Sequence, residues 1–196
     1  MKLIDITREL FSTPVYPGDP APTLEFVRSL ADGGDDNLSR FSACSHNGTH
    51  LDAPLHFMKG GGDVCSVRLE AVYGPCIVAR ASGVLTESQM AALLDKARDP
   101  ERLLLSGGAQ LSTEAALYAA NSGIRLIGTE CSSIAPESDP TGPHRALLSA
   151  GTVILENLDL KNAAPGEYIL CALPLKIQGA EASMVRAVLL DDSEEI

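Results

Sequence analysis

The chain has 196 residues, 45% of them hydrophobic and 21% charged, and its formal net charge is -11. This acidic excess argues against an extended phosphate-binding surface, because nucleic-acid binding depends on Lys and Arg. A basic start followed by an apolar run is absent, and no apolar run could span a bilayer, so we expect neither a secretory signal nor a membrane span. The five cysteines are scattered and form no CxxC. They predict neither a disulfide framework nor a zinc ribbon, and they indicate a cytoplasmic protein with reduced thiols.

In chain order, the residue pattern predicts strands that greatly outnumber the helices. The sequence Thr86 to Gln89 has the pattern of a helix-capping box, and Gly123 has the place of a left-handed helix C-cap. Because no repeat, low-complexity block or linker divides the chain, we expect one domain over residues 1–196. The predicted class is mixed α/β, with two helices covering a sheet of mixed direction. The predicted strands are 2–7, 23–29, 38–45, 76–81, 102–106, 124–128, 152–156, 167–173 and 184–190, and the predicted helices are 88–97, 113–121 and a short 143–149.

Three of the four histidines fall within eleven residues, at His46, His50 and His56, and Asp52 lies among them. Neutral imidazole and carboxylate are standard ligands for Zn, Mn or Fe, and the residue types do not choose among these ions. Gly48 and Pro54 disfavour a helix, so a strand passing into a turn is the better prediction. In extended backbone, side chains separated by even numbers lie on one face. The spacing therefore predicts that His46, His50 and Asp52 point the same way toward one ion.

The run from His46 to Phe57, HNGTHLDAPLHF, resembles the HxGTHxDxPxHF signature of the cyclase-type metal-dependent hydrolases, a family that includes bacterial kynurenine formamidases and isatin hydrolases. The resemblance extends along nearly the whole chain. Further matches are Tyr16-Pro17-Gly18-Asp19, Gly128-Thr129-Glu130 through Ser133, the pair His144 and Glu156, and the C-terminal segments at 172–176 and 179–187.

The resemblance implies a compact β/β/α fold, a homodimer or larger assembly, and a site for two divalent ions. His46, His50 and Asp52 would hold the first ion, Asp52 would bridge to the second, His144 would bind the second, and Glu156 would bridge both. His56 would remain free as the catalytic acid and base. The implied reaction is hydrolysis of a small-molecule amide, as in an arylformamidase that releases formate from N-formyl-L-kynurenine. Zn is the expected metal, with Mn as the other candidate.

Alternatives stay open at several positions. His56 could instead be a ligand or orient one, and Phe57 fits core packing as well as a substrate wall beside Tyr16. The family's aromatic before Pro-Gly-Asp is typically Trp where this chain has Tyr16, and its middle segment has Asp where this chain has Glu130. These departures leave an isatin hydrolase or another amide hydrolase open. A metal-binding protein without turnover is a separate alternative, because Zn alone can stabilise a fold. Cys44 and Cys131 are expected to have no catalytic task, and Lys176 and Arg186 could bind a substrate carboxylate or form ion pairs.

Overall fold

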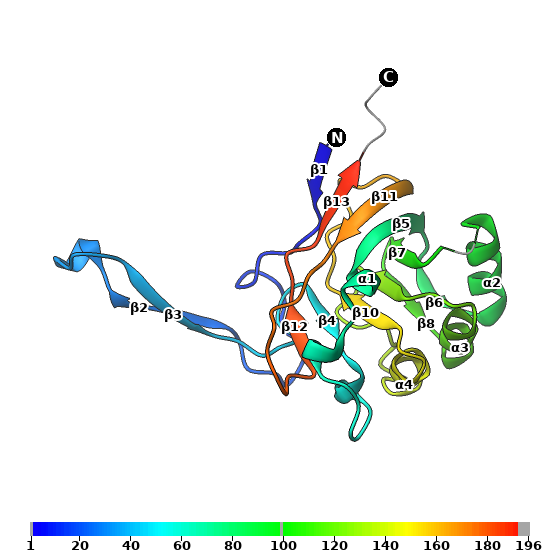
Figure 1. Ribbon diagram of the computed structural model, residues 1–196, viewed down its shortest axis with the longest axis horizontal. Coiled ribbons are helices and arrows are strands. Elements are labelled where there is room, and N and C mark those ends of the chain that lie inside the picture. The colour runs from blue at the N-terminus through cyan, green and yellow to red at the C-terminus, as the bar shows by residue number, and fades with distance from the viewer. Residues whose placement is uncertain (1, 99, 192–196) are drawn as a thin grey trace.

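Nine strands form one curled sheet of mixed direction in the computed structural model, which describes residues 2–98 and 100–191 (Figure 1). The four central strands β5, β7, β9 and β10 are mutually parallel, and the remaining neighbours pair antiparallel. This confirms the predicted mixed α/β class. In spatial order the strands are β1 (Lys2–Asp5), β13 (Val188–Asp191), β11 (Gly166–Cys171), β5 (Tyr73–Arg80), β7 (Arg102–Ser106), β9 (Leu126–Thr129), β10 (Val153–Glu156), β4 (His50–Asp52) and β12 (Ala182–Met184).

Strand β7 lies in the parallel middle of the sheet and is buried on both faces. Four of its five residues are buried, as expected for a strand that is covered on both faces. On the concave side, Leu104 joins a core that the curled sheet encloses with Leu51, Leu155 and Leu189. On the other side, Leu103 and Leu105 join a second core beneath the helices. The sheet therefore separates two hydrophobic cores, and its ligand-bearing strands lie between them.

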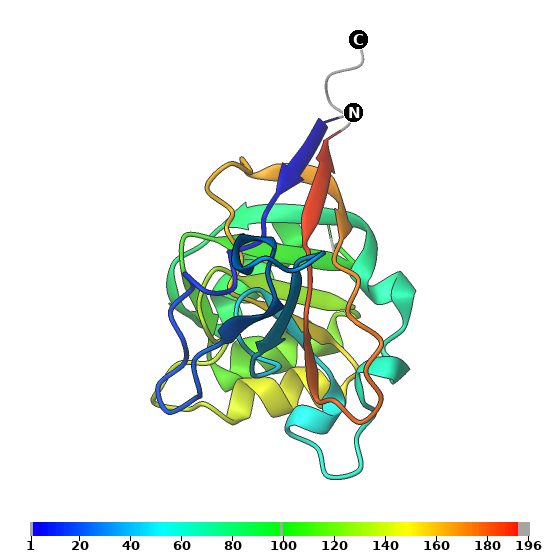
Figure 2. The same ribbon diagram turned by 90° about the vertical axis from the view of Figure 1, so that its left-hand side faces the viewer.

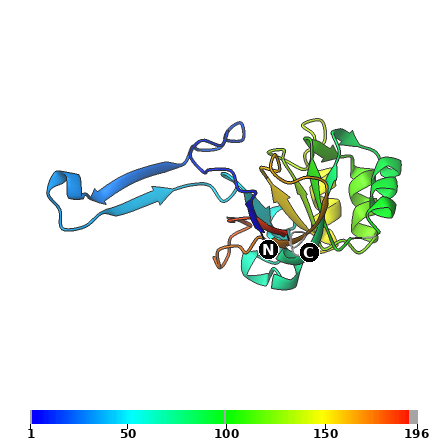
Figure 3. The same ribbon diagram turned by 90° about the horizontal axis from the view of Figure 1, so that it is seen from above.

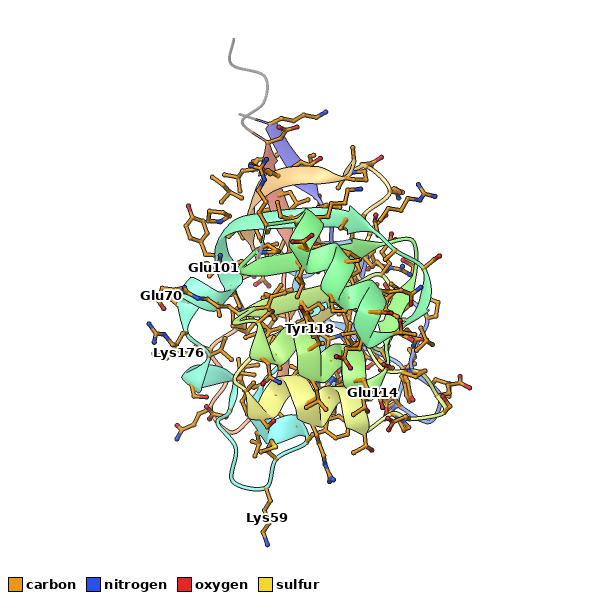
Figure 4. All side chains as sticks on the ribbon, turned by 90° about the vertical axis from the view of Figure 1, so that its right-hand side faces the viewer. Lys59, Glu70, Glu101, Glu114, Tyr118 and Lys176 are labelled. Atoms are coloured by element: carbon orange, nitrogen blue, oxygen red, sulfur yellow. The ribbon has the colours of Figure 1, made fainter. Side chains whose placement is uncertain are left out.

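Helices cover the convex face of the sheet (Figure 4, where Glu114 and Tyr118 of α3 face the viewer). They are α2 (Glu87–Lys96), α3 (Thr113–Asn121) and α4 (Gly142–Ser149). The capping box is confirmed, because Thr86 and Gln89 cap each other across the first turn of α2. Gly123 has φ of 85°, as expected for a residue just past the end of α3. In the described part of the chain, no helix is both long and apolar enough to cross a bilayer.

The short elements were not predicted, because each has too few residues to show a period. They are the one-turn helix α1 (Leu69–Val72), the pair β6 (Gly83–Leu85) and β8 (Ala109–Leu111), and the 3-10 turns η1 (Leu30–Asp32), η2 (Pro54–His56) and η3 (Val64–Ser66).

The prediction of one strand over 184–190 was wrong. The structure divides this run between β12, which pairs with β4 at one edge of the sheet, and β13, which pairs with β1 and β11 near the other edge. Only residues 185–187 connect the two strands, so the two ends of the sheet lie close together. The curl of the sheet explains the error. Because it brings the two edges close together, one continuous apolar run can form a strand at each edge.

A two-stranded hairpin projects from this body (Figures 1 and 3). Strand β2 (Thr23–Arg28) pairs with β3 (Leu38–Ser42), and every residue of both strands is exposed. Figure 2 looks along this arm toward the curled sheet behind it. The register pairs Leu24 with Phe41 and places Phe26 on the same face, whereas Glu25 and Arg40 form an ion pair on the other face. We call residues 23–42 the arm; it has one apolar and one polar side.

Candidate metal centre

The centre is built on two adjacent strands. Strand β4 pairs antiparallel with β10, and Glu156 lies directly opposite His50. Directly opposed residues project to the same face of a sheet, so His50, Asp52 and Glu156 share one face. The buried hydroxyl of Thr49 donates to the carbonyl of Asn157 at 2.6 Å, which extends the pairing by one residue. The strand ladder therefore sets the positions of three of the predicted ligands.

His144 reaches the same place from α4. The start of this helix is held by Asp139, which accepts hydrogen bonds from the Gly142 amide at 2.9 Å and the Thr113 hydroxyl at 2.6 Å. A Cβ at Gly142 would lie 1.9 Å from the Thr113 hydroxyl oxygen and 2.4 Å from Asp139 Oδ2, so any other residue would displace these two side chains. The His144 Nδ1 donates to the Pro140 carbonyl at 2.8 Å, and this directs Nε2 toward the carboxylates.

His46 comes from a turn, so the predicted strand begins only at His50 before it passes into the turn at 54–56, and the expectation that His46 lies on the same extended strand was wrong. Residues 45–49 form a turn that leads into β4. Gly48 has φ of 67°, in the left-handed region that favours glycine, so the backbone is not extended between His46 and His50. The Gly48 carbonyl accepts from Nδ1 of His50 at 2.9 Å. The turn nonetheless brings His46 to the same carboxylate as His50, for a different reason than the even spacing.

Asp52 is fully buried at the middle of the cluster. Its Oδ1 lies 3.1 Å from His46 Nδ1 and 3.6 Å from His50 Nε2, and its Oδ2 lies 3.8 Å from His144 Nε2. Glu156 lies beside it, with one oxygen 3.3 Å from His50 Nε2 and the other 3.3 Å from His144 Nε2. The structure thus brings together all five residues for which the sequence predicted metal binding.

The donor set fits a cation. Both oxygens of Asp52 and Nε2 of His50 are buried without a hydrogen-bond partner, as is Nε2 of His46. Unpaired buried polar atoms are costly, and a bound cation would satisfy those that converge on it. Two groups of three residues have mutually close donor atoms: His46, Asp52 and His56, and His50, Asp52 and Glu156. Asp52 is common to both groups.

The cluster is strongly coupled electrostatically. Burial alone would lower the pKa of His50, but the carboxylates of Glu156 and Asp52 outweigh it and raise the pKa to about 9. The pKa of His144 is raised against burial by the same carboxylates. In return, His144 and His50 hold the pKa of the buried Glu156 well below its usual range. Positive charge is therefore favoured beside Asp52 and Glu156.

His56 differs from the other histidines. It lies at the end of η2, its ring centre is 4.2 Å from that of His46, and no hydrogen bond or ion pair of its imidazole is found within the described residues. Burial, the largest cause, lowers its pKa despite the nearby carboxylates. At neutral pH this imidazole is uncharged and can accept a proton.

A cavity of about 240 Å³ opens onto the cluster. Tyr16 forms part of its wall and is 41% exposed. Phe57 also lines it, and the same ring stacks on His144 with centres 4.5 Å apart and packs against the core under the helices. A larger cavity of about 690 Å³ lies elsewhere, beside Tyr168 and Glu101, and no histidine lines it.

Sequence reasoning missed several groups at the site. Ser132 and Ser133 line the cavity, and Glu181 lies 3.4 Å from His46 Nε2. Ser133 and Glu181 lie in segments that resemble the family's signature, but no spacing rule links these residues to the histidine cluster, so their place at the site comes from the folded chain. Glu130 has a structural position, because its carboxylate accepts hydrogen bonds from the amides of Gly107 at 2.6 Å and Leu160 at 3.1 Å.

The structure also describes other polar residues that the sequence left open. Burial raises the pKa of the Cys131 thiol, which disfavours a thiolate nucleophile. Arg186 forms an exposed ion pair with Asp5 at 2.5 Å. Lys176 is exposed at the edge of the molecule (Figure 4).

A histidine and carboxylate cluster of this kind, on a curled mixed sheet, defines a metal-dependent hydrolase type of site. The family model Cyclase, described as "Putative cyclase", matches residues 4–136. Because this is more than half of the chain, the protein belongs to that family.

Two relatives with curated names align with most of this sequence. A kynurenine formamidase of Delftia acidovorans is 37% identical over 91% of both chains. Another from Erythrobacter litoralis is 34% identical over 90% of this chain and 87% of that protein.

Solved structures have the same fold. One described as a potential metal-dependent hydrolase with cyclase activity superposes with a TM-score of 0.81 at 28% identity over 96% of both chains. Isatin hydrolase A from Labrenzia aggregata superposes with a TM-score of 0.83 at 22% identity over 96% of this chain and 93% of its own, which shows the fold alone.

Proposed function

We propose that this protein is a metal-dependent hydrolase of linear amides, acting as an arylformamidase that converts N-formyl-L-kynurenine to L-kynurenine and formate. The observation that carries the proposal is the buried Asp52, whose two oxygens have no hydrogen-bond partner among three histidines. The two curated relatives support the choice of substrate. The five free cysteines support the cytoplasm as its compartment.

Two divalent ions are proposed, with Zn²⁺ as the metal and Mn²⁺ as the alternative. His46, His50, Asp52, His144 and Glu156 would hold them, and Asp52 would be shared because its Oδ1 faces His46 and His50 whereas its Oδ2 faces His144. When bound, divalent ions at such a site polarise a carbonyl oxygen and lower the pKa of water. The chain supplies the remaining functions.

His56 is the proposed acid and base. As an uncharged imidazole at neutral pH it can take the proton of the water that attacks the formyl carbon. It then returns this proton to the nitrogen as the C–N bond breaks, so that formate and a free amine leave. Its lack of a carboxylate partner among the described residues leaves the imidazole free for both transfers.

The cavity wall orients the substrate. Tyr16 and Phe57 are aromatic side chains at its mouth and wall, and they suit the aryl ring of an N-formyl arylamine. Ser132 and Ser133 add polar groups on the same wall. A pocket with aromatic walls and few polar groups is typical of a small-molecule site.

The proposal is tested by metal analysis and formate release on one preparation, purified without chelator and assayed with N-formyl-L-kynurenine and, separately, isatin. About two equivalents of metal per chain with rapid formate release are expected. Metal with turnover of isatin alone would replace the arylformamidase by an isatin hydrolase, and metal without turnover of either would contradict the amidase activity. Failure to bind Zn²⁺ or Mn²⁺ would contradict the whole proposal.

A homodimer is also proposed, and the arm supports it. Its side chains Leu24, Phe26 and Phe41 are 50–61% exposed on one face. An isolated two-stranded hairpin is marginally stable in water, and a large exposed apolar patch marks an interaction surface. A second copy is the proposed partner because a two-fold arrangement would cover both arms at once. The same chain also exposes Leu175 and Ile177 on the connection between β11 and β12, which offers apolar surface to the arm of a partner.

Light scattering after gel filtration tests this proposal at micromolar concentration. The unmodified chain is expected to be dimeric and the double variant Phe26→Ser/Phe41→Ser monomeric. Leu117→Ser is the matched control, because Leu117 is also about half exposed but lies on α3, away from the arm. A monomeric unmodified chain, or a double variant that remains dimeric, would contradict the proposal.

A further inference from the structure

The imidazole of His46 lies between two carboxylates. On one side its Nδ1 is 3.1 Å from Asp52 Oδ1, and on the other its Nε2 is 3.4 Å from Glu181 Oε1. Asp52 is completely buried at the centre of the cluster, whereas the side chain of Glu181 is 39% exposed at its edge. The two nitrogens therefore meet carboxylates in very different surroundings.

Glu181 is held firmly in this position. The Ser45 hydroxyl donates to its Oε1 at 2.5 Å, the same oxygen that approaches His46. The Glu181 carbonyl accepts from the Ala53 amide at 2.9 Å, and the next residue, Ala182, pairs with Asp52 in the ladder between β12 and β4. The backbone pairing that places Asp52 inside the cluster thus also places Glu181 outside it.

The other two histidines of the cluster show a different pattern. Nδ1 of His50 lies 2.9 Å from the Gly48 carbonyl, and Nδ1 of His144 lies 2.8 Å from the Pro140 carbonyl. A carbonyl can only accept, so in both residues the proton is on Nδ1 and the free nitrogen is Nε2. In His46, by contrast, Nδ1 is the nitrogen beside Asp52, and Nε2 is buried without a hydrogen bond.

We infer that Glu181, whose Oε1 approaches Nε2 of His46 to 3.4 Å, is a positioning residue: in the metal-loaded protein it accepts a hydrogen bond from Nε2–H of His46 and thereby presents Nδ1 of His46, the opposite nitrogen from that of His50 and His144, to the metal. A carboxylate behind a ligand histidine selects its tautomer, fixes its ring and makes it a stronger ligand. The inference rests on the metal site of the proposed function and is independent of the substrate.

Metal affinity of the apoprotein tests the role of Glu181 without any assay of activity. In competition with a chromophoric chelator, Glu181→Ala is expected to bind Zn²⁺ about 10- to 100-fold more weakly than the unmodified chain. Glu181→Gln retains an oxygen that can accept from Nε2–H and should recover most of the affinity. The matched control is Glu167→Ala, at an exposed position on β11.

Tautomers provide a second readout that a general loss of stability would not change. The chain has only four histidines, so long-range ¹H–¹⁵N spectra of the Zn²⁺-loaded, ¹⁵N-histidine-labelled protein can be assigned with single variants. The proton is expected on Nε2 of His46 and on Nδ1 of His50 and His144.

Two outcomes would overturn the inference: a proton on Nδ1 of His46, or unchanged Zn²⁺ affinity in Glu181→Ala. A different result, no Zn²⁺ binding by the unmodified chain, would overturn the proposed metal site and this inference with it. Metal binding without turnover of N-formyl-L-kynurenine would contradict only the proposed reaction and would leave the Glu181 result to be judged by itself.

Discussion

The arm, residues 23–42, is followed closely in the chain by residues 46–56 of the metal centre. The two regions depart in opposite ways from the usual rule that apolar groups are buried and polar groups are exposed or hydrogen-bonded. The arm exposes the apolar side chains of Leu24, Phe26 and Phe41 to solvent. The centre buries polar atoms of Asp52 and His50 without hydrogen bonds. Apolar surface without cover and buried polar atoms without partners both indicate a missing partner, but of different chemistry. The missing partner of the arm is a protein surface, and that of the metal centre is a cation.

Substituting a carboxylate in each region tests this contrast, and it should give the largest effect. Asp52→Asn keeps the shape of the buried side chain but removes its charge, so metal content should fall sharply. Loss of metal assistance costs several kcal/mol of transition-state stabilisation, which corresponds to a fall in kcat/KM of about 10³-fold or more. Asp36→Asn in the arm, which removes an exposed partner of Arg28, should leave both quantities unchanged. Equal metal content and kcat/KM in the two variants would contradict the assignment of the centre.

His56→Ala should lower kcat by about 10²- to 10⁴-fold while metal content stays the same. The pKa of His56 lies below 6.5 because the ring is partly buried. The activity of the unmodified protein should therefore be constant near neutral pH and fall as acidification protonates the imidazole. Metal analysis together with a pH profile of kcat/KM measures both effects. A variant that loses its metal along with activity would make His56 a ligand.

Removing the metal should make stability depend on alkaline pH. His50 has a pKa raised to about 9, so its charged form stabilises the metal-free fold below about pH 6.5, and this contribution is lost as pH rises through 9. Thermal unfolding of chelator-treated protein should show a Tm lower by on the order of 5 °C at pH 10 than at pH 7. The metal-loaded protein should show a smaller decrease, because the bound cation replaces the imidazolium. Identical pH dependence with and without metal would argue against the cation site.

The smallest effect is expected for the stability of the monomer when the arm is changed. Phe26→Ser should alter the free energy of unfolding by no more than about 0.5 kcal/mol at concentrations where the chain is monomeric, because the Phe26 side chain is 61% exposed. Leu51→Ala, in the enclosed core, should cost about 2–5 kcal/mol. Urea unfolding of both variants measures the difference. A large loss for Phe26→Ser would mean that the arm folds back onto its own body.

The sequence predicted best where one element obeys one pattern. Strand β7 (Arg102–Ser106) and helix α3 (Thr113–Asn121) have the predicted bounds, because a buried apolar run and a run of helix formers with a cap are local signals. The run 184–190 misled because apolar character does not show where a strand leaves one sheet edge for another. Apolar and polar residues alternate in β2 and β3 as they do in half-buried strands. Only the structure shows that every residue of these two strands is exposed.

The same distinction holds at the site. The histidine spacing predicted convergence of His46, His50 and Asp52, but the physical reason was a turn at Gly48 and not a continuous extended backbone. Glu181 could not be predicted, because its link to His46 depends on the pairing of β12 with β4. The hydrogen bonds from two backbone amides to Glu130 could not be predicted from the sequence either, since these amides lie 23 and 30 residues away.

The pairing of β4 with β10 also has a consequence for how the protein folds. The hydrogen bond from Thr49 to Asn157 joins residues 108 positions apart, and His50 and Glu156 sit one step inside it. Closing so long a loop costs chain entropy before any contact compensates for it. A slip of one residue in this ladder would turn His50 and Asp52 to the opposite side of the sheet. We therefore expect the complete set of ligands to come together late in folding, once this distant pair of strands has found its correct register.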